Sequence, residues 1–149
     1  MGAVKIYGSN KYYSLSNKAV ASLESDINIE YKEIYILNMV PNIIDNRESN
    51  NAPSGLMVYS GAISYSYTII TDTFNTFDDI EMNNFIKLLN ILKMPYLFIA
   101  NKDYPDNYLD DTDAIRINIA NMPQIEYNGR VHLEIEFIPI LQTEIEAPR

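Results

Sequence analysis

The carboxylates and the single histidine are the residues that could do chemistry in this 149-residue chain. His132, Glu134 and Glu136 alternate with apolar residues, so all three point to one face of a predicted strand. Two carboxylates at this spacing could share acid–base work. However, metal sites usually need at least two His or Cys ligands, and general bases usually lie in pockets. We therefore interpret this row as the solvated face of a strand.

A second group of carboxylates lies in the segment Asp103–Asp113. Its aspartates are Asp103, Asp106, Asp110, Asp111 and Asp113. Clustered oxygen ligands on a loop can bind calcium. Their spacing does not follow the alternating pattern of the twelve-residue calcium loop, and no glycine supplies its sharp turn. A solvated charged loop is the preferred interpretation, and a calcium-binding loop is the alternative.

Motifs for other chemistry are missing from the sequence. It contains no Gly-x-Ser-x-Gly, no glycine-rich phosphate loop and no His-Glu-x-x-His. Since there are no cysteines, disulfides and thiolate chemistry are excluded. We predict a protein that is not an enzyme, with no catalytic residue, no cofactor and no bound metal.

The charge balance limits the partners. Twenty acidic and 11 basic residues give a net charge of −9, which repels nucleic acid and anionic membranes. No apolar run approaches the roughly 18–20 residues that span a bilayer, and the start of the chain lacks a hydrophobic signal core. We expect no specific nucleic-acid binding and no membrane insertion. The chain should stay soluble where it is made, or leave as part of an assembly.

One amphipathic helix is predicted over about residues 78–93. Asp78 followed by Glu81 forms a capping-box-like start, and Thr76 is a rival cap. Apolar residues recur at three- and four-residue steps along it. These are Met82, Phe85, Ile86, Leu89 and Leu92. Burying five such side chains makes this helix the predicted plug of the core.

Alternating or continuous apolar segments predict the strands around this helix. We expect strands near 4–7, 27–39, 64–71, 96–100, 115–119 and 131–137, and a helical turn near 19–23. In 27–39 the apolar residues change parity midway, which indicates either a bulge near Lys32-Glu33 or two strands. Long loops are predicted at about 41–54 and 102–113, the first as an exposed arm or a segment that a partner orders.

The closing hairpin poses a question of register. With a three-residue loop Tyr127–Gly129, Ile125 would face Val131 and Ile119 would face Phe137, so both apolar rows would share one face. A two-residue turn would put the rows on opposite faces. We therefore predict the three-residue form.

Together these elements predict a single α+β domain over residues 1–149. Its expected architecture is an antiparallel β-sandwich or half-barrel with one principal helix packed on it.

The order of elements from residue 63 onward carries a resemblance. An alternating strand Ser64–Asp72 precedes the helix and the strand Tyr96–Ile99. The loop Asp103–Tyr108 (Asp-Tyr-Pro-Asp-Asn-Tyr), the hairpin Ile125–Arg130 and a last strand with a proline follow. This order resembles the N-terminal, ring-forming domain of the phage distal tail protein family, itself similar to tail-tube proteins. It covers about residues 63–139, while residues 1–60 do not match that family's usual opening.

The resemblance implies a structural role in a phage tail or a related contractile injection machine. The expected subunit forms a closed ring or tube segment around the DNA channel, as a distal tail, tube, terminator or baseplate component. Its expected partners are further copies of itself and neighbouring tail proteins. Its expected location is the virion tail, after synthesis in the host cytoplasm.

Overall fold

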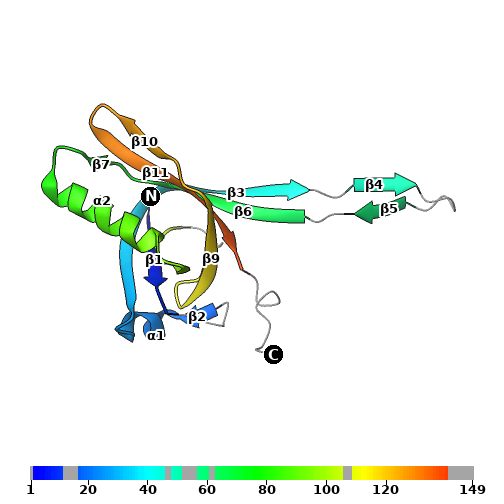
Figure 1. The fold of residues 1–149 in the computed structure, drawn as a ribbon, viewed down its shortest axis with the longest axis horizontal. Coiled ribbons are helices and arrows are strands. Elements are labelled where there is room, and N and C mark those ends of the chain that lie inside the picture. The colour runs from blue at the N-terminus through cyan, green and yellow to red at the C-terminus, as the bar shows by residue number, and fades with distance from the viewer. Residues whose placement is uncertain are drawn as a thin grey trace.

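The computed structural model describes residues 2–11, 17–45, 48–51, 57–60, 63–105 and 109–140. In this part the chain forms strands and two helices (Figure 1). In order they are β1 (Gly2–Ser9), β2 (Asn17–Ala19), α1 (Val20–Ser25), β3 (Ile29–Asp45), β4 (Glu48–Asn51), β5 (Met57–Ser60), β6 (Ile63–Thr71), β7 (Phe74–Asn75), α2 (Asp79–Leu92), β8 (Tyr96–Asn101), β9 (Asp113–Asn121), β10 (Gln124–Tyr127) and β11 (Arg130–Pro139).

Six antiparallel strands close into a barrel. Their order is β11-β6-β3-β1-β8-β9, and β9 pairs back with β11. The short strands β10 and β2 extend the sheet, and β7 pairs with β11. The α+β class is therefore confirmed, but the architecture is a barrel rather than the predicted sandwich. Closure depends on β11, which pairs with both β6 and β9 along its length.

The barrel interior is the main core, and α2 is part of it. The buried helix residues Phe85, Leu88, Ile91 and Leu92 belong to the same apolar cluster as the inward-facing residues of the barrel strands. The helix was thus predicted correctly as an element of the core, but its buried face is rotated slightly from the predicted one. Ile86 is half exposed, whereas Leu88 and Ile91 are buried.

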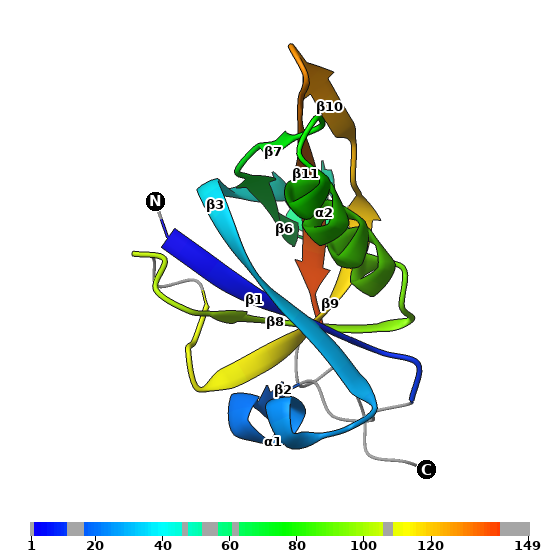
Figure 2. The ribbon, with the colours of Figure 1, turned by 90° about the vertical axis from the view of Figure 1, so that its left-hand side faces the viewer.

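A second core lies outside the barrel, under α1. Leu23 of α1 packs with Tyr7, Ile29 and Phe98, which point outward from β1, β3 and β8. In Figure 2, α1 lies beyond the crossing strands β1, β8 and β9 and away from α2. Since Leu97 and Ile99 of β8 face the interior cluster, both faces of β8 are buried, as its continuous apolar sequence predicts.

The second core also explains the change of parity in β3. Ile29 faces the outer cluster and Ile34 faces the barrel interior. The pairing with β1 is regular from Ile29 to Ile36, so the bulge predicted near Lys32-Glu33 is wrong. The register shift lies further on, between Ile36 and Asn38, where β3 passes from β1 to β6.

The start of α2 is set by Asp78. Its carboxylate accepts hydrogen bonds from the backbone nitrogens of Ile80 and Glu81, at 2.9 and 3.4 Å. This confirms Asp78 rather than Thr76 as the cap. Glu81 reaches back to the nitrogen of Asn75 at 3.2 Å, which fixes the link before the helix.

The closing hairpin has a two-residue turn, so the predicted three-residue loop is wrong. Tyr127 pairs with Arg130, and both Asn128 and Gly129 have positive φ (52° and 74°), as a type I′ turn requires. Ile125 consequently pairs with His132 and is partly exposed. Ile119 still pairs with Phe137, as predicted, because the register between β9 and β11 shifts beside that pair. The three-residue loop was predicted because it would keep both apolar rows on one face of the sheet. In the structure, a register shift in the pairing of β9 with β11 determines these faces instead.

The segment predicted as a loop over 41–54 contains strands. β3 continues to Asp45 in a paired ribbon with β6, and β4 pairs with β5 further along the chain. This two-stranded projection, which we call the arm, leaves the barrel and points away from it (Figure 1). Its polar sequence, Asp45 to Asn51, carries no apolar alternation from which strands would be predicted.

Candidate functional site

The polar row on β11 lies where the sequence placed it. Val131, Leu133, Ile135 and Phe137 are buried, while His132, Glu134 and Glu136 between them are half-buried. The Nε2 of His132 is 3.9 Å from Glu134 Oε2, and Glu136 accepts a 2.8 Å hydrogen bond from the hydroxyl of Ser66. The first contact lies within β11, and the second joins β6 to β11 across the barrel wall.

The acidic segment between β8 and β9 is folded back on the barrel. Asp103 accepts a 2.6 Å hydrogen bond from the nitrogen of Ala3, and Asp110 accepts two bonds of 2.8 Å from Thr112. Hydrogen bonds from Thr112 lower the pKa of Asp110. Leu109 anchors the segment in the interior core.

Asp106 lies outside the described residues. Within the described part of the chain, no group of three or more His, Asp or Glu side chains is placed to hold a metal ion. This geometry gives calcium binding no advantage over a solvated loop.

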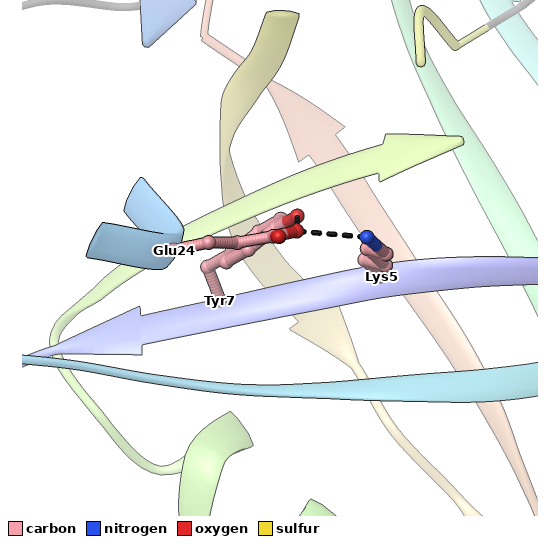
Figure 3. A network of polar contacts seen from close by, with 3 residues as sticks. All are labelled: Lys5, Tyr7 and Glu24. Carbon is pink, nitrogen blue, oxygen red and sulfur yellow. Dashed lines mark hydrogen bonds and ion pairs between the residues drawn. The ribbon is translucent and has the colours of Figure 1, made fainter. Parts of the chain in front are cut away.

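A polar network joins α1 to β1 (Figure 3). Oε2 of Glu24 accepts hydrogen bonds from Lys5 Nζ at 2.8 Å and from the Tyr7 hydroxyl at 2.7 Å. The hydrogen bond from Lys5, followed by the one from Tyr7, lowers the pKa of Glu24, and the same bond raises the pKa of Lys5. Burial and the bond to Glu24 raise the pKa of Tyr7. The network fastens α1 to the barrel, and the sequence offered no signal for it because Glu24 lies far along the chain from Lys5.

The arm is the most unusual feature of the molecule. Along β3 from Asn38 to Asp45, and along β6 from Ile63 to Ser66, each strand has its partner on one side only. No other described strand pairs with the outer edges of this ribbon. Two-stranded ribbons are marginally stable alone, and free edges attract further strands.

A groove runs between β3 and α2. It has a volume of about 500 Å³ and is lined by Ile29, Glu30, Tyr31, Lys32, Lys87, Asn90 and Ile91. Lys32 donates a 3.1 Å hydrogen bond to Asn84 of α2, so it bridges the two walls. Burial, followed by the nearby charge of Lys87, lowers the pKa of Lys32. Sequence reasoning missed this site, because no pattern links lysines on separate elements.

Exposed apolar side chains gather where α2 begins. Phe77, Tyr127 and Ile80 are 86%, 76% and 73% exposed. The nitrogen and hydroxyl of Thr76 both donate to the carbonyl of Gly129, which joins this link to the hairpin tip. The Phe77 ring lies against Gly129, whose left-handed backbone (φ 74°) favours glycine.

No protein-family model matches the sequence, and no curated protein matches it either. Among the described residues, no helix is both long and apolar enough to cross a bilayer.

Proposed function

We propose that this chain is a structural subunit of a phage tail or of a related contractile injection machine. In this proposal it forms a ring or tube segment around the DNA channel, as a distal tail, tube, terminator or baseplate component. Its partners are further copies of itself and neighbouring tail proteins, and its location is the virion tail. The role is non-enzymatic.

The observation that carries this proposal is the arm. A ribbon whose outer edges have no strand partner in the described chain gains stability when another surface covers it. A closed barrel with a helix in its core is a rigid base from which such an arm can reach a neighbour. Head-to-tail contacts of this kind generate closed rings or open tubes, because each interface joins two different surfaces.

The charge of the chain supports the same role. A net charge of −9 suits the wall of a channel through which DNA must pass without binding. A nucleic-acid-binding subunit would need the opposite balance.

Negative-stain electron microscopy of the concentrated protein tests the proposal, with sedimentation velocity as a quantitative measure. We expect rings or tubes from the intact chain. A matched variant replaces residues 43–65 with Asn-Gly. Because Asn42 and Ser66 are direct partners in the ribbon, a two-residue turn can join them. This variant should keep the barrel and lose the assemblies. Monomers of the intact chain at every concentration would contradict the proposal, as would unchanged rings from the variant without the arm.

A further inference from the structure

The groove between β3 and α2 holds two ammonium groups close together. Lys87 is exposed on α2, and Lys32 reaches across from β3 to Asn84. Glu30 is the carboxylate that lines the same groove. After burial, the charge of Lys87 contributes to the lowered pKa of Lys32, so the two cations lie close enough to repel each other. An incoming carboxylate would relieve their repulsion.

A source of such carboxylates lies at the other end of the same subunit. Asp110, Asp111 and Asp113 are exposed in the segment before β9. The segment is anchored beside the start of β1, where the nitrogens of Lys102 and Asp103 donate to the carbonyl of Ala3.

The groove, in contrast, lies beside the far end of β1. Lys32 pairs with Ile6, and Ile29 pairs with Ser9. At about 3.3 Å per residue, several residues of β1 separate the two charged sites by roughly 10–20 Å. The acidic segment of a subunit is therefore too far from its own groove to fill it, while that of a neighbouring copy can approach it in a head-to-tail contact.

We propose that the acidic segment Asp110–Asp113 of one copy docks into the β3–α2 groove of the next copy, with Asp111 beside Lys87. The contact joins two different surfaces and has complementary charge, so it can propagate around a ring. This inference rests on the proposed function, since it names a second contact, in addition to the arm, through which neighbouring copies of the ring would meet. The hydrogen bond from Lys32 to Asn84 positions the second positive charge of the groove.

Charge reversal on each side tests the contact. Lys87→Glu and Asp111→Lys each put like charges together, and each should weaken self-association about tenfold or more in sedimentation velocity. An equimolar mixture of the two variants should recover association. In that mixture the reversed groove meets the reversed segment, and the two remaining wild-type surfaces also match. The Lys87→Glu/Asp111→Lys double variant should recover it alone.

Matched controls carry the same changes of charge away from the contact. Lys93→Glu lies on the end of α2 outside the groove, and Glu126→Lys lies on the exposed strand β10. Both should associate like the wild type, and thermal melting should show that every variant is folded. Carbodiimide cross-linking of mixed isotope-labelled and unlabelled chains should join Lys87 of one copy to Asp111 of another.

The possible failures are distinguishable. If the wild type assembles but Lys87→Glu and Asp111→Lys assemble equally well, the contact is wrong while the proposed ring stands. Loss of assembly in both variants without recovery in the mixture would also overturn the contact. If the wild type neither assembles nor cross-links at any concentration, the contact and the ring are both overturned.

Discussion

Strand β3 passes through two different environments. Its first half pairs with β1, and there Ile34 and Ile36 are buried in the barrel. Its second half pairs with β6 and leaves the barrel, and Val40 and Pro41 are already exposed where it does so. The same strand therefore has one half that the fold stabilises by burial and one half that gains little from the subunit itself.

This contrast separates the stability of the subunit from its function. The barrel has two apolar clusters, one inside and one under α1, and needs no partner to bury them. The arm has backbone edges that the described chain leaves without a strand partner. Changes in the barrel core should therefore alter folding, and changes in the arm should alter assembly with little effect on folding.

The largest expected effect is on the barrel core. Phe85→Asp places a carboxylate at a side chain that is 3% exposed and packed on Phe74, with ring centroids 5.1 Å apart. An unpaired buried charge should cost more than about 5 kcal/mol, which reaches the lower end of the roughly 5–15 kcal/mol that stabilises a domain, so we expect the folded state to be lost. Circular dichroism should show loss of the folded signal and of cooperative melting.

The neighbouring residue supplies the control for that prediction. Ile86 is half exposed, so Ile86→Asp should cost less than about 1 kcal/mol. Equal destabilisation by the two substitutions would mean that α2 does not present the Phe85 face to the core.

The helix shows how far the sequence could predict this fold. Asp78, Glu81 and the apolar spacing gave its position and its cap correctly, because those signals are local. Its rotation was partly wrong, since Leu88 and Ile91 are buried while Ile86 is not. Which face of the helix is buried depends on how the barrel strands, which are far away in the sequence, pack against it. The periodicity of the helix sequence alone does not carry this information.

The second-largest effect should come from Glu24, which fastens α1 to the barrel. Glu24→Gln removes the charge that accepts from both Lys5 and Tyr7, and should cost about 1–2 kcal/mol at neutral pH. The folded protein lowers the pKa of Glu24 below its ordinary value of 4.5. The carboxylate therefore contributes stability above pH 4.5, and this contribution is lost as the pH falls through the lower folded pKa.

Urea denaturation at pH 7 and again well below pH 4 measures this dependence. The gap in unfolding free energy between wild type and Glu24→Gln should shrink at the lower pH. Glu126→Gln on exposed β10 is the matched control and should show no gap at either pH. A gap that is independent of pH would mean that the network contributes by packing rather than by charge.

Two errors of register have a common physical cause. The three-residue turn was predicted from the rule that both rows of the hairpin share one face, yet a shift beside Phe137 lets Ile119 and Ile125 take different faces. Likewise, the parity change in β3 reflects two cores, with Ile29 outside and Ile34 inside, rather than a bulge. Bulges and second cores are properties of the closed barrel, so no single strand reveals them. The candidate assembly surfaces were still less predictable, since Lys32 and Lys87 meet only in the folded chain.

The smallest expected effect needs no substitution. It is a difference in amide hydrogen exchange between the two halves of β3. In the monomer, β3 amides that bond to β1 should exchange with solvent only on global unfolding, because they lie within the closed barrel and the inward side chains Ile34 and Ile36 are buried in its core. Amides beyond Met39 that bond to β6 should exchange faster by local opening, since this ribbon ends away from the core. Assembly should slow the second group, because the arm gains a partner, and in the first group it should affect only the residues that line the β3–α2 groove. Hydrogen exchange with mass spectrometry at low and high protein concentration measures both halves in one sample.

The contradicting outcome is an arm whose amides are as protected in the monomer as those of the barrel. Such an arm would not need a neighbour for its stability, so assembly through the arm would be ruled out while the description of the barrel would stand.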